Sequence, residues 1–139
     1  MKVKIEENGY MPMRAHFDDA GIDFRTPEEF TLKPLESHVV DLNVKVQIPV
    51  GYFGKLESKS GLMVNHGVVC MGGVIDSGFR GNIKVRMMNL SDKSYTFHKG
   101  DKLVQMVLIP VLLADIESVE TLDVSESGRE TSGYGSTGR

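Results

Sequence analysis

Hydrophobic and polar residues alternate with a period of two along much of the chain. In HVVDLNVKVQI every second position is apolar: Val40, Leu42, Val44, Val46 and Ile48. This period is typical of a half-buried strand and is incompatible with a helix. We therefore predict a strand over residues 38–48 that ends at Pro49, and the same alternation in NIKVRM predicts a second strand over residues 82–87.

Three further kinds of segment complete the pattern. LVQMVLIPVLL is apolar almost throughout, which predicts a strand buried on both faces and ended by Pro110. Short strands are expected at residues 2–6 and 95–98, and KPLE, PVGY, DSGF and KGDK predict turns. Only SGLMVNHG, residues 60–67, predicts a helix. Many short strands with 15 glycines in the chain indicate an all-β sandwich, jelly roll or barrel.

Length and charge narrow the class of protein. A chain of 139 residues is the usual size of one domain. The net charge of -3, from 16 basic and 19 acidic residues, provides no positive excess for DNA or RNA, so we expect no nucleic-acid partner. A small anionic ligand held by a few cations is compatible with this balance.

The cysteine content and the hydropathy bear on the compartment. Cys70 is the single cysteine, which excludes an internal disulfide and a cysteine metal cluster and agrees with a reducing compartment. No signal-peptide core is present at the N-terminus, and no run approaches the roughly twenty apolar residues of a membrane span. We expect a soluble, cytoplasmic protein without a membrane partner.

Two internal stretches in the first half of the chain carry polar residues that packing does not require. DDAGIDF, residues 18–24, places three carboxylates around a glycine, and it reads either as a solvated turn or as part of a site. ESKSGLM, residues 57–63, brings Lys59 between two serines where a helix is expected to begin. Free backbone N–H groups beside Ser and Lys favour an anion site, but an ordinary serine N-cap of the helix explains the same residues.

Three later stretches have the same character. GGVIDSGFRG, residues 72–81, predicts a hairpin that presents Asp76 and the ring of Phe79, although a plain hairpin is an equal alternative. HKGDKLVQM sets Gln105 on an apolar strand, where its amide must bond to backbone or point into a site. The polar tail RETSGYGSTGR, residues 129–139, carries Tyr134 between two glycines.

Taken in order, AGIDF, SKSGL, GGVIDSGFRG, GDKLVQM and RETSGYGSTG resemble the five motifs of the homotrimeric dUTP diphosphatases, the dUTPases. The resemblance covers nearly the whole chain. It implies a distorted jelly roll over residues 1–128 and a flexible C-terminal arm over residues 129–139. It further implies a homotrimer that hydrolyses dUTP to dUMP and pyrophosphate with Mg²⁺, with each site built from all three subunits.

The resemblance assigns the nucleoside and the chemistry to the third motif. Asp76 would be the catalytic group, a general base that activates water for in-line attack on the α-phosphorus. Phe79 would lie under the deoxyribose and exclude a 2′-hydroxyl. The backbone of the glycine-rich approach would read the uracil edge and reject cytosine, through residues Gly72, Gly73, Val74 and Ile75.

The resemblance assigns the phosphates to the second, fourth and fifth motifs. Lys59, Ser60 and Gly61 would bind the phosphates, with Ser60 near the oxygen between the α- and β-phosphates. Asp23 and Gln105 would hold waters of the magnesium ion, and Gln105 would also face the substrate. The arm would close the site, with Arg129 on the γ-phosphate, Tyr134 stacked on uracil, and the phosphates wrapped by Gly135, Ser136, Thr137 and Gly138.

Several positions depart from the common family pattern. The second motif commonly reads RSG, whereas Lys59 is a point charge without the planar fork of arginine. Phe79 stands for the usual tyrosine and keeps the ring without its hydroxyl, and Gly78 replaces an acid. In the arm, Glu130 and Ser132 stand where glycines are common, and Tyr134 stands for phenylalanine.

Two other functions are known for proteins that resemble the dUTPases. A dCTP deaminase relies on a pocket glutamate, whereas this hairpin offers only Asp76. A regulatory protein on the same fold would bind a partner and be switched by nucleotide. Products from dUTP and dCTP separate these hypotheses.

Overall fold

The computed structural model describes residues 1–124 and residue 126. Within them, eleven strands and one helix follow one another along the chain. Their bounds are β1 (Lys2–Ile5), β2 (Ile22–Arg25), β3 (Phe30–Leu32), β4 (Ser37–Asp41), β5 (Val44–Gln47), β6 (Tyr52–Ser58), α1 (Ser60–His66), β7 (Val68–Met71), β8 (Val74–Ile75), β9 (Lys84–Asn89), β10 (Tyr95–Phe97) and β11 (Lys102–Pro110).

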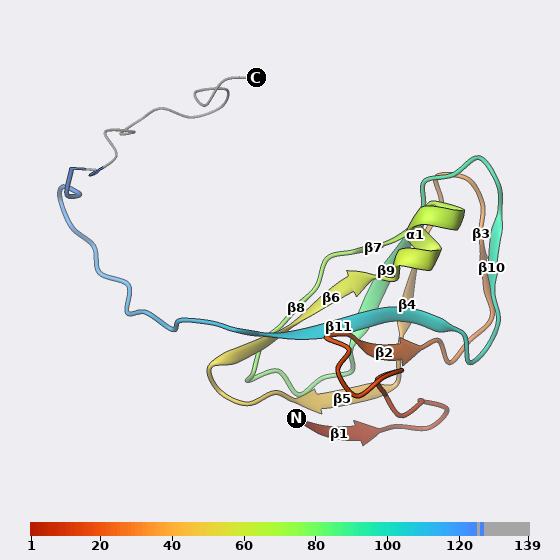
Figure 1. Cartoon of the computed structure of the whole chain (residues 1–139), viewed down its shortest axis with the longest axis horizontal. Helices are drawn as coiled ribbons and strands as arrows, with labels where there is room; N and C mark the ends of the chain where they lie inside the picture. Colours follow the sequence, from red (N-terminus) through yellow and green to blue (C-terminus); the bar gives the residue numbers. More distant parts are fainter. Residues whose placement is uncertain (125, 127–139) are drawn as a thin grey trace.

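The strands form four small sheets. Their orders are β2-β11-β6-β8, β4-β9-β7, β1-β5 and β10-β3, and every recorded pairing is antiparallel. Strands adjacent in a sheet are often distant in sequence, as for β2 and β11, so the chain crosses repeatedly between sheets (Figure 1). This is the all-β, jelly-roll-like fold expected from the sequence.

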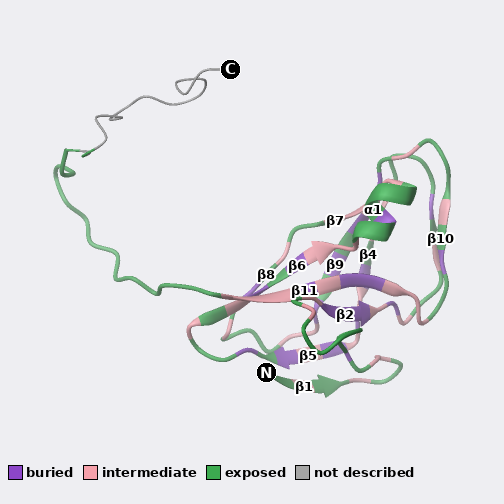
Figure 2. Ribbon diagram, viewed as in Figure 1, coloured by how far each residue is buried: buried purple, intermediate pink, exposed green. Residues whose placement is uncertain are grey.

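Strand β11 is the longest and lies between β2 and β6 in the four-stranded sheet. Its first half is buried through Leu103, Val104 and Met106, while residues 107–109 are half-buried (Figure 2). The prediction of burial on both faces therefore holds for the first half only. Through this buried part β11 pairs with β2 on one side and with β6 on the other, and both strands hold or lead to residues of the candidate site.

The strand expected over residues 38–48 is broken in the structure. β4 ends at Asp41 and pairs with β9, whereas β5 begins at Val44 and pairs with β1. Between them Asn43 takes a φ of 54°, and its backbone N–H donates to the Asp41 carboxylate at 2.9 Å. Asparagine tolerates this left-handed conformation better than most residues. Because Leu42 stays buried at the kink, the alternation in the sequence does not reveal it.

Helix α1 occupies the expected residues and ends where a glycine permits it. Gly67 has a φ of 66°, and its N–H donates to carbonyl groups of the last turn. The left-handed conformation costs a residue with a Cβ about 1–2 kcal/mol, so glycine is the natural C-terminal residue here. Leu62 is the residue of α1 that is buried.

Residues 111–124 leave the packed body after β11 (Figure 1). They are exposed throughout, and several are large and apolar: Leu112, Leu113, Ile116, Val119, Leu122 and Val124. No helix in the described part of the chain is long and apolar enough to span a membrane.

A carboxylate, two lysines and a hairpin at the ends of β6

A buried carboxylate lies on β2, an edge strand of the four-stranded sheet. Asp23, on β2, is 5% exposed. Its Oδ1 accepts a hydrogen bond from Lys59 Nζ, and its Oδ2 accepts one from Lys102 Nζ at 2.7 Å. Lys59 directly precedes α1, and Lys102 is the first residue of β11. Three segments distant in sequence therefore meet at one carboxylate.

The two lysines decide the charge state of Asp23. Burial by itself would raise the pKa of this carboxyl group, because it penalises the charged form. The hydrogen bonds from Lys102 and Lys59 outweigh burial and hold the pKa below its ordinary value. Asp23 is therefore ionised at neutral pH and is paired rather than free.

Gln105 lies beside this cluster. It is the cross-strand neighbour of Asp23 in the pairing of β11 with β2, so the two side chains share a face of the sheet. Its Nε2 donates to the Ser58 carbonyl at 3.1 Å, which is the bond to backbone that its position requires. Its Oε1 lies against Gly21, where a Cβ would come within 2.0 Å of this oxygen, so a larger residue there would displace the Gln105 amide.

The phosphate-binding residues expected in the second motif are accessible. Ser60 and Gly61 are exposed at the beginning of α1. A Cβ at Gly61 would meet no atom within 4 Å, so the space in front of this turn is open. Lys59 makes no side-chain capping bond to α1, because an ammonium group has no acceptor for the helix N–H groups, and it pairs with Asp23.

The third motif forms a short hairpin at the other end of β6. Gly72 and Gly73 have φ values of 84° and 144°, and a Cβ at Gly73 would come within 2.9 Å of Leu56. The glycine pair thus lets the chain press against β6 before β8 begins. Asp76 follows β8 and is exposed, and its carbonyl accepts from Phe79 N–H at 3.1 Å to close the turn.

The hairpin forms one wall of an open hollow of about 410 Å³. Phe79 lies in it over Gly81, where a Cβ would come within 2.7 Å of the ring. Asn82 also lines the hollow, and its Oδ1 is the buried side-chain polar atom of the described residues that has no hydrogen-bond partner. The complete lining is Val74, Ile75, Asp76, Phe79, Gly81, Asn82 and Lys84.

The two groups of residues do not meet within one chain. Ile75 pairs with Gly54 near the beginning of β6, whereas Ser58 at its end leads directly to Lys59. Four residues of extended strand separate Gly54 from Ser58, which is about 13 Å at 3.3 Å per residue. Figure 1 shows β8 and α1 at opposite ends of β6. The structure therefore brings Asp23, Lys59, Ser60, Gly61 and Gln105 together, and separately Gly73, Val74, Ile75, Asp76 and Phe79.

Lys102 was not predicted from the sequence as a member of the first group. The signal was the motif GDKLVQM, in which this lysine precedes Gln105 by three residues. Its partner was not predictable, because the contact depends on the register of β11 against β2. The arm residues Arg129, Tyr134, Gly135, Ser136, Thr137 and Gly138 lie outside the described residues.

Cys70 lies between the two groups, and its Sγ donates to the Gly72 carbonyl at 3.5 Å. Its backbone N–H donates to Ser58 Oγ at 2.8 Å. Burial raises the pKa of its thiol to about 11, and the charge of Glu57 adds to that rise. A thiol with so high a pKa stays protonated and is a poor nucleophile at neutral pH.

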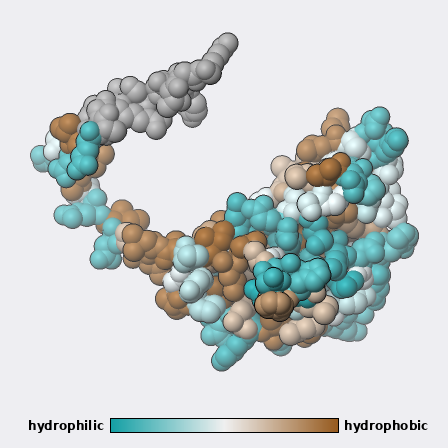
Figure 3. Space-filling model, viewed as in Figure 1, coloured by the Kyte–Doolittle hydropathy of each residue, from teal (hydrophilic) through white to brown (hydrophobic). Residues whose placement is uncertain are grey.

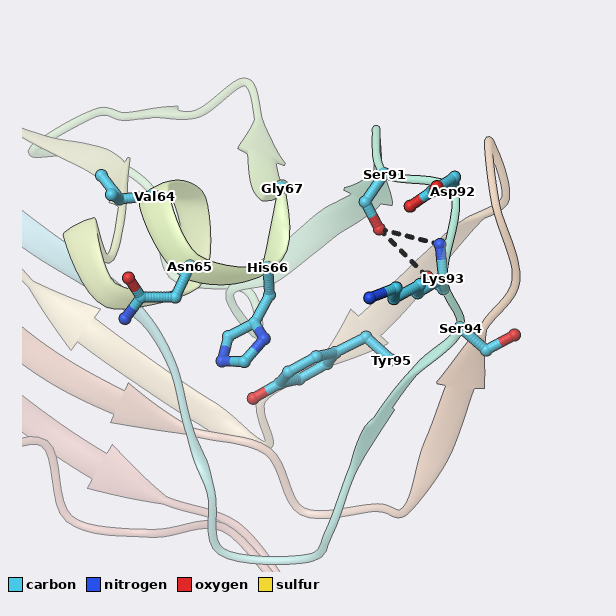
Figure 4. A pocket seen from close by; sticks show the side chains of 9 residues that line it. All are labelled: Val64, Asn65, His66, Gly67, Ser91, Asp92, Lys93, Ser94 and Tyr95. Atoms are coloured by element: carbon cyan, nitrogen blue, oxygen red, sulfur yellow. Dashed lines mark hydrogen bonds between the residues drawn. The ribbon is translucent and has the colours of Figure 1, made fainter.

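A second hollow, of about 330 Å³, lies between the end of α1 and the loop before β10 (Figure 4). The rings of His66 and Tyr95 lie 4.7 Å apart at its wall, and Ser91 Oγ donates to the Lys93 carbonyl at 3.0 Å. None of the residues expected to act on a ligand lines it.

The described residues fit a magnesium ion only through water. They contain no group of three His, Cys, Asp or Glu side chains able to hold a metal. Asp23 and Gln105 share a face, and each carboxylate oxygen keeps a second lone-pair direction beside its lysine. This donor set suits an ion that keeps several waters.

The all-β, jelly-roll-like fold, with a cationic cluster and an exposed carboxylate on a hairpin, fits the class of jelly-roll enzymes that act on phosphorylated ligands. The dUTPase family model matches residues 7–138. The deoxyuridine 5'-triphosphate nucleotidohydrolase of Clostridium novyi is 36% identical over 97% of this chain and 95% of its own length. The chain belongs to the dUTPase family.

Solved structures agree with this assignment. The dUTPase of Staphylococcus bacteriophage 80alpha, solved with dUpNHpp, superimposes with a TM-score of 0.88 at 32% identity, covering 99% of this chain and 98% of that one. A dUTPase mutant from phage phi11 of S. aureus has a TM-score of 0.80 at 30% identity over 88% of this chain and 97% of that chain. That structure is described as showing the coordination of a structural Mg(II) ion.

Proposed function

We propose that this protein hydrolyses dUTP to dUMP and pyrophosphate, with Asp76 as the general base. The observation that carries the proposal is the position of Asp76. This residue is exposed on a hairpin that follows Gly72 and Gly73, and it lines a hollow of about 410 Å³, which is large enough for a nucleoside. Family membership and a relative solved with the dUTP analogue dUpNHpp support the choice of substrate.

In this proposal the hairpin binds the nucleoside and positions the water. The backbone of Gly73, Val74 and Ile75 reads the uracil edge, and the Phe79 ring packs under the deoxyribose. Asp76 accepts the proton of the attacking water as it approaches the α-phosphorus in line with the leaving pyrophosphate. General-base catalysis of this kind contributes typically 10²–10⁴ in rate.

The phosphates are bound by the other group. Ser60 and Gly61 present accessible polar groups at the start of α1, and Lys59 adds positive charge. Asp23 and Gln105 would hold the waters of a Mg²⁺ ion, which when bound neutralises charge on the phosphates. The arm residues Arg129, Tyr134, Gly135, Ser136 and Thr137 would close over this site.

We also propose a homotrimer, because one chain does not assemble the site. The hairpin and the lysine cluster lie at opposite ends of β6, so a neighbouring chain must complete each pair. Residues 111–124 support this arrangement, since Leu112 is 88% and Ile116 100% exposed. Figure 3 shows apolar surface along the segment that leaves the body. An exposed apolar stretch of this length is typical of a protein interface.

Chromatography of the products tests the function. Purified protein incubated with dUTP and Mg²⁺ is expected to form dUMP and pyrophosphate in equal amounts, with dCTP left intact. Formation of dUTP from dCTP would instead identify a deaminase, and orthophosphate with dUDP would place the attack at the γ-phosphorus. Either result would overturn the proposal.

A regulatory role is a second candidate, and one comparison favours it. The bacteriophage 80alpha relative is described as one of the phage dUTPases that control transfer of virulence genes by a G protein-like mechanism. For this chain such a role requires a protein partner whose binding changes with nucleotide. Affinity capture with and without dUpNHpp tests it, and identical captured proteins in both conditions would argue against a switch.

A further inference from the structure

Asp23 binds one more cation than it needs. A buried carboxylate is neutralised by one lysine, yet Lys59 and Lys102 each occupy one of its oxygens. The two ammonium groups and one carboxylate leave a net charge of +1. The side chains of Lys59 and Lys102 are 25% and 37% exposed, so both lysines are half-buried but reach the surface, whereas that of Asp23 is 6% exposed.

Nearby acids do not cancel this surplus. Glu57 is the neighbour of Gln105 on β6, and its carboxylate pairs with Lys55 at 2.6 Å. The His16 backbone N–H donates to the Asp19 carboxylate at 2.9 Å and holds its pKa below the ordinary value, against the opposing charge of Asp23, and His16 Nδ1 lies 3.2 Å from the same carboxylate. Neither acid pairs with Lys59 or Lys102, so both ammonium groups remain beside Ser60.

We propose that Lys102 is a further triphosphate-binding residue, and that Asp23 is the positioning residue that holds Lys59 and Lys102 as a pair. The proposal rests on the proposed function and adds a residue to its phosphate site. Each ammonium has three donors, and Asp23 uses one of them. The remaining donors of Lys102 are directed to the phosphate oxygens beside those bound by Lys59.

The fold explains why this arrangement is rigid. Lys102 is paired with Arg25 in the β11–β2 ladder, and Lys59 follows the end of β6, which pairs with β11. Both backbones are thus fixed by the same sheet that buries Asp23. A cation held in advance by a buried acid loses less freedom when the ligand binds than an exposed lysine does. Asp23 therefore improves phosphate binding through the lysines and does so without a metal ion.

The test uses Lys102→Met and ligands that differ in phosphate number. Binding of dUpNHpp and of dUMP is measured by calorimetry in EDTA, so that no metal contributes. We expect Lys102→Met to weaken dUpNHpp about 10-fold, as loss of a charge-assisted hydrogen bond predicts, and to change dUMP by less than about 3-fold. Lys99→Met is the matched control, since Lys99 lies three residues away and its ammonium donates to Asn8 Oδ1 at 3.5 Å; it should leave both affinities unchanged.

Two further variants keep the proposal falsifiable if Lys102→Met does not fold. Lys102→Arg retains the charge and should stay within about 3-fold of the original protein for dUpNHpp, whereas Lys102→Gln should lose affinity like Lys102→Met. Equal weakening of dUMP and dUpNHpp would show a merely structural role and overturn the proposal, as would unchanged affinity for dUpNHpp. If the unaltered protein itself fails to bind dUpNHpp, the proposed function falls rather than the assignment of Lys102.

Discussion

At the scale of single residues, two aspartates show how the surroundings of a carboxylate determine what it can do. Asp23 is buried and bound by two lysines, so it remains charged and has little freedom. Asp76 is exposed at the end of β8, where only its backbone is used to close the turn. The first can organise other charges, and the second is available to a water molecule and a substrate.

Asp76→Asn tests the second aspartate. The amide is nearly isosteric but cannot accept the proton of the water, so turnover of dUTP should fall by about 10²–10⁴. Binding of dUpNHpp should change less than about 3-fold, because the variant keeps the hairpin and its polarity. Steady-state kinetics and calorimetry measure the two effects. Turnover similar to that of the unaltered protein would remove Asp76 from its proposed role.

Asp23 gives a pH dependence with a definite sign. Its pKa is lowered by the lysines, so the pairing stabilises the fold above the unfolded pKa of about 3.9 and is lost as the pH falls through the folded value. The difference in unfolding free energy between the protein and Asp23→Asn should thus be full at pH 6 and shrink below about pH 4. Urea titrations at several pH values measure it. A gap of constant size down to pH 3 would contradict this account.

At the scale of secondary-structure elements, the sequence predicted the helix and the strands whose sequence signals are local. The helix was expected over residues 60–67 and lies over 60–66, and the strand expected over residues 82–87 lies two residues later as β9, where the alternation matches the burial. The break between β4 and β5 was not predicted, because Leu42 and Val44 are buried on both sides of it. The kink at Asn43 is set by pairing with different strands, β9 and β1, and such pairing is not encoded in a local period.

Gly67 allows this level to be tested. Gly67→Ala should lower the free energy of unfolding by about 1–2 kcal/mol, because the left-handed φ of 66° is unfavourable for alanine. The new Cβ would also lie 3.0 Å from Ser91 Cβ. Gly61→Ala is the control in the same helix: its Cβ meets open space, so stability should be unchanged or rise by up to about 1 kcal/mol. Chemical denaturation compares the two, and equal effects would contradict the role given to Gly67.

At the scale of the whole molecule, the separation of the candidate site into two groups could not be read from the residue pattern itself, although the family resemblance implied sites shared between subunits. The five motifs were recognised in order along the chain, and the family membership that they indicated is confirmed. Their distribution depends on the pairing of Ile75 with Gly54, which places the hairpin at the far end of β6 from Lys59. No spacing in the sequence reports this register, because the intervening loop allows several.

The separation predicts complementation between two inactive variants. Asp76→Asn lacks the base, and Lys59→Met lacks a phosphate-binding cation, so each alone should be nearly inactive. In randomly mixed trimers about one quarter of the sites combine an intact hairpin from one chain with an intact cation from another. Co-expressed variants should then recover about a quarter of the original rate, whereas separately purified variants mixed without subunit exchange should not. No recovery despite mixed trimers would place both groups of one site in the same chain.

In the proposed trimer, the position of the two groups at opposite ends of β6 would also link nucleotide binding to assembly. A ligand that contacts the hairpin of one chain and the lysines of another is bound only by the assembled protein, and it must therefore favour assembly over separate chains. At a free concentration 100 times its dissociation constant, a ligand adds about 2.7 kcal/mol per site to the state that binds it. Cellular nucleotide would then act as a structural component of the enzyme, and the protein would withstand greatest dilution when its substrate is most abundant.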